Sequence, residues 1–374
     1  MIVHGDRSAS AGGQALRQEA LLFPNITLAQ APLPIAYGTH HTKMMLLSYD
    51  VGMRTQGMWI SPLFLKTDSP TAPDSETHFK ADLIEYLRTY NMSTLTKLSD
   101  SIRHYDMSCA RVCLVASSPG RHTGPTKAQF GHLKLRSLLA KHCSTTDSTN
   151  QEPWHEWPVI GQFSSIGSLG PTADSWLTGE LLETLSTPLT GPLGRRAPLN
   201  LIFPTVDNVR LSLEGWAGGG SLPYSEATAL KQQYLNKFLH VWKSEEKGRN
   251  NCMPHVKTYA RVSPDLTRCS WFLMTSANMS KAAWGAMEKA SSQVMIRSYE
   301  IGVLLLPKFH HPGAATFSIS HDCNSPVAQN NCSARPSLFL PYDLPLKEYS
   351  QTDRPWTWDG SMAGLKDRFG KCRR

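Results

Sequence analysis

GTHHTKMMLLSYD (38–50) and MPHVKTYARV (253–262) are the two stretches that decide how this chain is expected to fold. Each contains a His-x-Lys pair, HTK at 41–43 and HVK at 255–257. In a β-strand, residues i and i+2 point to the same face, so each pair is expected to present an imidazole beside an ammonium group. Two such pairs in one cleft would supply a nucleophile, an acid/base and two fixed positive charges. These groups are enough for a phosphodiesterase that uses no metal.

The same three-residue pattern also occurs where it predicts no site. HFK (78–80) and HLK (132–134) open segments with apolar residues at helical spacing, so both are expected on solvated helical faces. The pair at 255–257 differs because CSWFLMTSAN (269–278) follows it and ends in small polar residues beside a helix start, where donors can converge on an anion. The pair at 41–43 precedes MMLL, which predicts a buried strand in which an unpaired lysine would be costly.

Composition narrows the classes of function. The chain has 374 residues, more than a single core usually holds, so two domains are expected. Its net charge of +8 and its pI near 9.0 favour a polyanionic partner. The eight cysteines include no CxxC pair and predict free thiols in a reducing compartment. No apolar stretch has membrane-spanning length, and the start MIVHGDRSASAGG is not ordered like a signal peptide.

Strand-like and helix-like segments alternate along the chain, which indicates α/β layers with mixed sheets. Strands are expected at MIVHG, ITLAQAPL, THHTKMMLLSY, GMWISPLF, ARVCLVASS, WPVIGQFSSIG, LNLIFPT, HVKTYARV, WFLMTSAN and IGVLLLP. Helices are expected over 78–90, 127–142, 173–185 and 225–246. A domain boundary is placed before ARVCLVASS, near residue 110. Two related domains that face each other would bring both His-x-Lys pairs into one cleft.

Ten motifs occur in order along the chain: GTHHTKMMLL, TQGMWISPL, HFKADLI, GQFSSIGSLG, SLEGWAGGGSLPYS, MPHVKTY, TSANMSKAAWG, IRSYEIGVLLLP, PYDLP and RPWTW. Together they resemble the tyrosyl-DNA phosphodiesterase family of the phospholipase D superfamily, from about Val3 to Trp358. The resemblance implies two phospholipase-D-like α/β/α sandwich domains with mixed sheets, related by a pseudo-twofold axis, with the active site between them. The expected divisions are 1–110, 111–358 and a divergent tail, 359–374.

The resemblance also implies roles for individual residues. His41 is expected to attack phosphorus and form a covalent phosphohistidine, while His255 acts first as general acid and then as general base. Gln56 and Glu300 are expected to orient the histidine rings. The alternative for Glu300 is a purely structural role as a buried ion-pair partner. Non-bridging oxygens would be held by Lys43, Lys257 and Asn278, and DNA would be contacted by Lys43, Lys257, Tyr37, Ser165 and Ser168. No metal or other cofactor is expected, because the lysines supply the positive charge.

Two neighbouring features are given other interpretations. His40, beside the expected nucleophile, would point to the opposite face of a strand and is taken as structural. The Gly-rich segment GWAGGGSLPYS (215–225) is similar to a phosphate-cradling loop but lacks the GK[ST] ending, so no nucleotide site is expected there. The resemblance places this loop near the substrate groove.

The function implied by the resemblance is DNA repair. The expected reaction is hydrolysis of the 3′-phosphotyrosyl bond between DNA and a topoisomerase I peptide, with other 3′ adducts as further substrates. The expected partners are DNA 3′ ends, single-stranded or in nicked and duplex DNA, and covalent topoisomerase I–DNA adducts. The protein is expected to be a monomer in the nucleus, with the cytoplasm as a second location, and without membrane contact. The alternatives are a catalytically impaired isoform that binds DNA ends and a lipid phosphodiesterase of the same superfamily.

The chain also departs from the family pattern, which predicts a truncated or alternatively spliced form. GMR passes directly to TQG at Arg54–Thr55, where the family has a further strand and turn. The first domain also starts late compared with the family. Loss of a central strand is expected to leave its neighbours unpaired and to expose MMLL (44–47) and MWISPLF (58–64).

Overall fold

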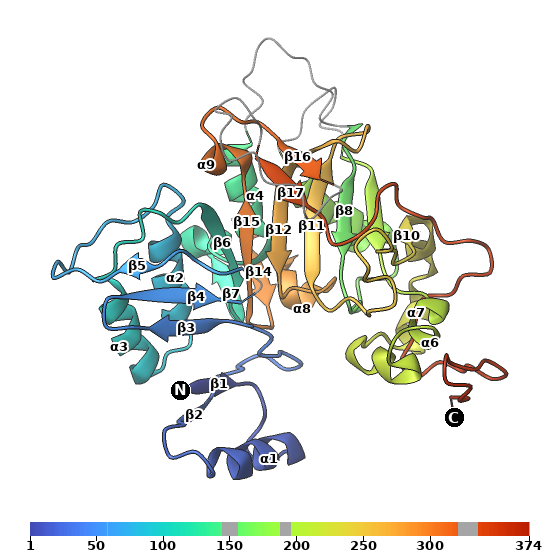
Figure 1. Cartoon of the computed structure of the whole chain (residues 1–374), viewed down its shortest axis with the longest axis horizontal. Helices are drawn as coiled ribbons and strands as arrows, with labels where there is room; N and C mark the ends of the chain where they lie inside the picture. The colour runs from blue at the N-terminus through green and yellow to red at the C-terminus, as the bar shows by residue number, and fades with distance from the viewer. Residues whose placement is uncertain (58, 144–155, 188–195, 321–335, 374) are drawn as a thin grey trace.

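A mixed nine-stranded sheet forms the centre of the computed structural model, which describes residues 1–57, 59–143, 156–187, 196–320 and 336–373 (Figure 1). The strands of this sheet are β6 (Val112–Ser117), β8 (Val159–Gln162), β9 (Leu199–Ile202), β10 (Leu239–His240), β11 (Lys257–Val262), β12 (Arg268–Thr275), β15 (Glu300–Leu305), β16 (Phe317–Ser320) and β17 (Ser337–Phe339). Their order is β10-β9-β8-β11-β12-β15-β6, with β16 paired to β12 and β17 to β16. β8, β9 and β10 run parallel, and the pairs from β8 to β6 are antiparallel. The predicted mixed α/β fold is therefore confirmed.

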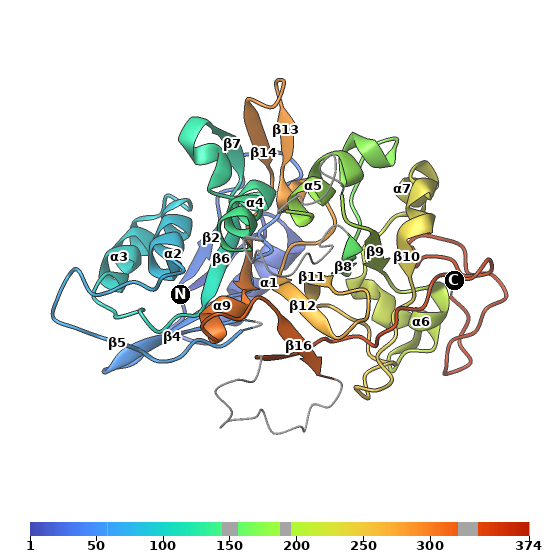
Figure 2. The ribbon, with the colours of Figure 1, turned by 90° about the horizontal axis from the view of Figure 1, so that it is seen from above.

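Strand β6 shows how helices cover both faces of this sheet. Alternate residues of a strand point to opposite faces. Cys113 and Val115 pack into one apolar cluster with α4 (Gly131–His142), whereas Leu114 packs into another with α2 (Phe79–Arg88). Figure 2 shows β6 between α2 and α4. The predicted domain boundary near residue 110 falls just before this strand and stays a prediction.

The first hundred residues form smaller sheets beside the large one. β1 (Ile2–His4) and β2 (Leu28–Gln30) pair in parallel around α1 (Ala11–Ala20), and β3 (Met45–Ser48), β4 (Gly52–Gln56) and β5 (Phe64–Leu65) form a three-stranded antiparallel sheet. α3 (Ser93–Ile102) packs against α2. The remaining elements are β7 (Gly120–Thr123), α5 (Leu182–Leu185), α6 (Val206–Arg210), α7 (Glu226–Lys231), α8 (Lys281–Trp284), β13 (Ala286–Glu288), β14 (Gln293–Ile296) and α9 (Pro307–His310).

The expected break at Arg54–Thr55 lies inside β4, where these two residues pair with Leu47 and Leu46 of β3. The prediction that β3 would be unpaired there is wrong, because β4 supplies its partner. The prediction of a buried strand is also wrong, because β3 has no neighbour on its other edge in the described structure and its residues are only half-buried or exposed. Exposure of the two apolar stretches is mixed. Met45 and Ile60 are exposed, but Phe64 is completely buried.

Several predicted elements are shorter than expected. The helix expected over 225–246 ends at Lys231, and β10 occupies part of its second half. Gln232 leaves the helical conformation because its buried side chain accepts from Leu169 N (2.8 Å) and donates to Gly167 O (3.1 Å). The helix expected over 173–185 is a 3₁₀ turn, a π turn and α5, and α4 begins only at Gly131, which has a φ of +64°. No strand covers 57 or 59–63, because Ser61 Oγ accepts from Thr55 N (2.9 Å) and turns the chain back onto β4.

The two His-x-Lys patterns outside the expected site lie at helix starts as predicted, but not on solvated faces. Lys80 is buried because its ammonium caps backbone carbonyls, among them Tyr105 O at 2.9 Å. His132 is buried between Glu180 (2.9 Å) and Thr184 (3.0 Å). Helical periodicity identifies the apolar face but not a polar residue that a neighbouring segment covers. Lys80 and His132 therefore belong to the protein interior, whereas His78 is exposed and Lys134 is half-buried.

Two further expectations concern the environment of the chain. The six described cysteines are free thiols, and Cys323 and Cys332 lie outside the described residues. Over the described ranges, the helices are all too short or too polar to cross a lipid bilayer.

Candidate active site

The segment before the first His-x-Lys pair docks onto the residues that lead into β15. Tyr299 N donates to Thr39 O (2.9 Å) and His41 N donates to Tyr299 O (3.0 Å). Gly38 permits this approach, because a Cβ at that position would lie 2.1 Å from Arg297 O. These contacts bring His41 beside Glu300, the first residue of β15, although 259 positions separate them.

The two histidines of the predicted site face each other. The ring centroids of His41 and His255 are 6.4 Å apart, with an angle of 71° between the ring planes. His41 Nδ1 lies 2.9 Å from Glu300 Oε2, and the carboxylate also accepts from Ser276 Oγ. Because a carboxylate only accepts, Nδ1 of His41 carries the proton and Nε2 keeps its lone pair. Nε2 can therefore act as a nucleophile, and the hydrogen bond from Nδ1 to the buried Glu300 carboxylate orients the ring.

The lysines reach the site through hydrogen bonds to their own motifs. Lys43 Nζ donates to His41 O (3.1 Å), and Lys257 Nζ donates to His255 O (2.6 Å). The expectation that each pair lies within a strand is wrong. β3 begins two residues after Lys43, and β11 begins at Lys257 itself. The two-residue spacing still places ammonium and imidazole together, because each lysine folds back onto the carbonyl of its histidine.

The site carries more positive than negative charge. Burial and the charge of Lys43 lower the pKa of Lys257 from 10.5 to about 8, against the attraction of Glu300. Partial burial and the charges of Lys257, Lys43 and His41 lower the pKa of His255 to about 4. The imidazole of His255 is therefore neutral at pH 7 in the free protein. Two ammonium groups with one nearby carboxylate form a site that favours an anion.

Asn278 lies three residues beyond the end of β12, in the turn that leads to α8. Its Oδ1 accepts from Ser164 N (3.1 Å) and Ser164 Oγ (3.2 Å). These bonds fix the amide so that its NH₂ group is directed elsewhere, and the described residues provide no acceptor for it. A fixed amide donor is suited to a phosphate oxygen. Over the described ranges, no group of three or more His, Cys, Asp or Glu side chains is arranged to hold a metal ion.

The remaining predicted residues lie around this centre at different distances from the chemistry. Ser165 Oγ donates to Pro223 O (2.6 Å), Ser168 is exposed, and Tyr37 is 90% exposed with a φ of 63°. Gln56 ends β4, and the described residues give its side chain no hydrogen bond to either histidine. Their roles in DNA contact and ring orientation stay predictions.

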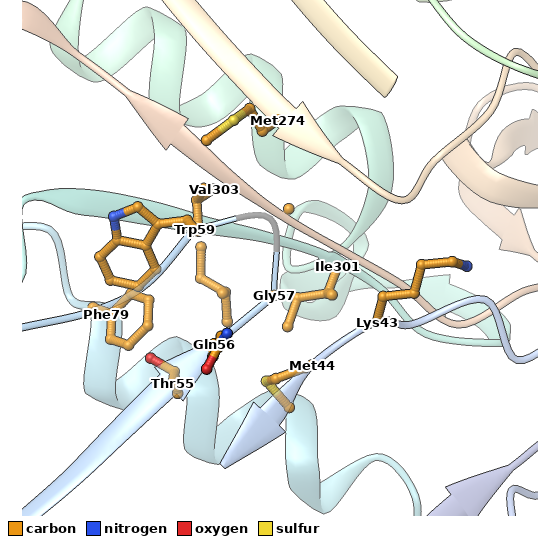
Figure 3. A pocket seen from close by; sticks show the side chains of 12 residues that line it. Lys43, Met44, Thr55, Gln56, Gly57, Trp59, Phe79, Met274, Ile301 and Val303 are labelled. Atoms are coloured by element: carbon orange, nitrogen blue, oxygen red, sulfur yellow. The ribbon is translucent and has the colours of Figure 1, made fainter. Parts of the chain in front are cut away.

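Gln56 instead lines a small apolar pocket between β4 and the large sheet (Figure 3). Trp59 and Phe79 lie at one end of this pocket, and the stem of Lys43 lies at the other with its ammonium directed away. Met274 and Val303 of the large sheet close the far wall. The volume is about 50 Å³, which accommodates a few water molecules and no nucleotide base.

Two residues with positioning contacts were not identified from the sequence: Ser164 bonds Asn278, and Tyr299 holds the backbone of His41. Ser276, one of the small polar residues that end CSWFLMTSAN, bonds Glu300 and not an anion. Ser164 had a weak signal, since it neighbours Ser165 in a polar turn. His40 contacts other groups than His41: its Nε2 lies 2.9 Å from Tyr90 Oη, and its ring packs edge-on against Tyr90 and Tyr299. The structural role expected for His40 stays a prediction.

Comparisons with known proteins identify the family to which this chain is similar. A family model described as Tyrosyl-DNA phosphodiesterase matches residues 1–350. Tyrosyl-DNA phosphodiesterase 1 of Drosophila melanogaster is 38% identical over 362 residues, which are 89% of this chain and 59% of that protein. The Arabidopsis thaliana protein of the same name is 34% identical, over 99% of this chain and 66% of its own length. The chain thus spans less than two thirds of these two relatives.

A third relative, named Probable tyrosyl-DNA phosphodiesterase in Caenorhabditis elegans, is 34% identical, over 89% of this chain and 71% of its own length. Among solved structures, the crystal structure of the yeast tyrosyl-DNA phosphodiesterase has a TM-score of 0.64 at 20% identity. That match covers 94% of this chain and 83% of the yeast chain, and it bears on the fold alone.

Proposed function

The chain belongs to the tyrosyl-DNA phosphodiesterase family, and we propose that it hydrolyses the phosphodiester that joins a DNA 3′ end to a tyrosyl group. The observation that carries the proposal is the meeting of the two His-x-Lys pairs, with Glu300 behind His41 and His255 opposite. Each half of the chain contributes one imidazole and one ammonium group. Neither half alone holds a complete site.

The first step transfers the DNA to the protein. His41 Nε2 attacks phosphorus, so a nitrogen–phosphorus bond forms as the bond between phosphorus and the tyrosyl oxygen breaks. The leaving oxygen takes a proton from His255 Nε2 or Nδ1. Glu300 stabilises the positive charge that develops on His41 through the 2.9 Å contact. Lys43, Lys257 and the Asn278 amide hold the non-bridging oxygens as charge moves onto them.

The second step releases the DNA. His255, now neutral, removes a proton from water, and the water oxygen attacks the phosphohistidine. The nitrogen–phosphorus bond breaks, and DNA leaves with a 3′ phosphate while His41 regains its lone pair. His255 holds the proton taken from water until the product leaves, and it then releases this proton, because the free protein keeps His255 neutral.

The protonation state required for the first step is supplied by the substrate itself. In the free protein the two lysines keep His255 neutral, through the lowered pKa. A phosphodiester bound between the ammonium groups offsets their charge and raises the pKa of His255 again. We infer that substrate binding takes up a proton, which makes His255 an acid only when a leaving group is present.

The finer assignments follow from the same chemistry. We propose that the partners are DNA 3′ ends, including covalent topoisomerase I–DNA adducts, that the chain acts as a monomer, and that it acts where DNA is, in the nucleus. The complete set of charged groups and the relatives' names favour an enzyme over an impaired DNA-end-binding isoform. A lipid phosphodiesterase receives no support from the comparisons.

The test is cleavage of an oligonucleotide with a 3′-phosphotyrosyl group in the presence of EDTA. We expect turnover by the unmodified chain, none by His41→Ala, and a covalent protein–DNA adduct that persists in His255→Asn. The matched control is His78→Asn, in the outlying HFK motif, where His78 is exposed with a φ of 58° that asparagine also tolerates. Turnover only with added metal, or an adduct that survives His41→Ala, would show that this mechanism is wrong.

A further inference from the structure

The C-terminal segment 359–373 folds against the Gly-rich loop and does not extend into solvent. Asp367 organises it: the carboxylate accepts from the backbone N–H of Phe369 (2.9 Å), Lys371 (2.9 Å) and Trp216 (3.4 Å). Trp216 Nε1 donates to Lys371 O (2.9 Å). Figure 1 shows the C-terminus beside α6 and α7.

The glycines of the loop serve this contact. A Cβ at Gly215, which has a φ of 58°, would lie 2.5 Å from Asp367 Oδ2. A Cβ at Gly219 would lie 2.0 Å from the ring of Trp356, over which Arg373 places its guanidinium at 4.5 Å. The Gly-rich loop therefore holds the C-terminal segment and Trp356 in place. Its contacts with the described residues are those of a packing loop and not of a loop that cradles a phosphate.

The tip of this segment, residues 366–371, carries an exposed aromatic ring beside cationic side chains. Phe369 is 58% exposed, and its centroid lies 5.6 Å from the Arg368 guanidinium carbon and 6.0 Å from Lys371 Nζ. Lys366, Arg368 and Lys371 are exposed and have no ion-pair partner among the described residues. The only carboxylate of the tip, Asp367, is occupied by backbone N–H groups. An exposed aromatic ring between free cations suits a partner with both flat bases and phosphates.

The tail is connected to the candidate active site through a short series of contacts. Ser164 bonds Asn278, and the next residue, Ser165, donates to Pro223 O (2.6 Å). Trp358 N donates to Tyr224 O (2.9 Å), and the Trp358 ring is 54% exposed. Trp358 is therefore an exposed aromatic side chain whose backbone contacts Tyr224, the residue after the one that meets Ser165.

We propose that Trp358, Arg368, Phe369 and Lys371 form a tail surface that binds single-stranded DNA upstream of the reacting 3′ end. Bases stack on the two rings, and the cations contact phosphates. This proposal rests on the proposed function for the direction of the strand, but binding at the tail surface needs no chemistry at the histidines.

The test measures binding of unmodified, fluorescently labelled single-stranded DNA of about four and about twenty nucleotides, lengths that lie below and above one typical binding site. The unmodified chain is expected to bind the long strand much more tightly than the short one. Phe369→Ala weakens binding of the long strand about tenfold, as expected for the loss of one stacked base. Arg368→Gln with Lys371→Gln lowers the slope of log affinity against log salt by about 1.4, since each single-strand phosphate contact contributes about 0.7.

The control is Leu22→Ala in the first turn after α1, which also removes an exposed apolar side chain (75% exposed) but lies in the N-terminal segment of the chain. Unchanged affinity and slope in the tail variants, or an equal loss in the control, would overturn the proposal. So would equally tight binding of heparin, a polyanion without bases, whether or not Phe369 is present. Because no turnover is measured, a failure of the proposed hydrolysis leaves these results intact, and loss of the tail effect leaves the proposed hydrolysis intact.

Discussion

Replacement of Lys257 by methionine is expected to stabilise the fold while it abolishes binding at the site. Lys257 is 1% exposed, and its ammonium is held beside Lys43 with only one hydrogen bond to its own motif. A pKa lowered from 10.5 to about 8 means that the charged form is less stable in the folded protein than in the unfolded chain. Methionine has a similar length and no charge, so it removes this cost.

The size of the effect follows from the pKa. A lowering of this magnitude corresponds to about 3 kcal/mol at any pH below 8. Loss of the hydrogen bond to His255 O destabilises the variant by roughly 1 kcal/mol and offsets part of this gain. The net increase in the free energy of unfolding is therefore about 2 kcal/mol, which is the expected effect of removing a buried charge. Lys97→Met is the matched control, because Lys97 is an exposed lysine of α3 outside the site, and replacement of its side chain predicts a change below about 0.5 kcal/mol.

The sign with pH separates this cause from better packing. Between about pH 8 and pH 10.5 the unfolded chain keeps the proton that folded Lys257 has lost, so the unmodified protein gains stability as pH rises. The advantage of the variant is therefore full at neutral pH and shrinks toward pH 10.5. Urea unfolding at about pH 7 and about pH 9.5 measures it. A destabilised variant, or an advantage that does not change with pH, would refute the reasoning.

Further outcomes follow from other contacts of the site. Glu300→Gln removes the charge behind His41 and is expected to lower turnover about 10²–10⁴-fold with little change in DNA affinity, which single-turnover kinetics and binding assays measure separately; equal losses in both would indicate a folding defect instead. Phosphodiester binding is expected to raise the pKa of His255 from about 4, so binding becomes stronger as pH falls from about 7. The accompanying proton uptake is measured by calorimetry, because it makes the binding enthalpy depend on the buffer. A binding enthalpy that is the same in all buffers contradicts this. Thr55→Val removes a buried hydroxyl without a hydrogen-bond partner from an apolar wall and is expected to stabilise the fold by about 1 kcal/mol, measured by urea unfolding.

The large sheet could be predicted from local sequence because its strands read as apolar runs bounded by polar turns. Val112–Ser117 lies within ARVCLVASS, and β15 begins one residue before the predicted IGVLLLP; both strands are buried on two faces. Shorter elements were less predictable. The segment after Lys231 has helical propensity, but hydrogen bonds from the buried side chain of Gln232 end the helix there. A single tertiary contact outweighs the small propensity difference of a few residues.

The sequence by itself determined which residues can carry the chemistry, because only imidazole, ammonium and amide groups at these motifs supply a nucleophile, an acid and fixed charge. It could not show which groups His40 and His41 contact, or that Lys80 and His132 of the HFK and HLK motifs are buried. Only the tertiary structure decided those points. The hydrogen bonds of Thr39 and His41 to Tyr299 join residues 260 and 258 positions apart. The free energy of this pairing depends on closure of that loop and on burial of both segments together. Local patterns do not contain this information, since the pKa of His255 and the partner of His41 are set by groups that meet only in the folded chain.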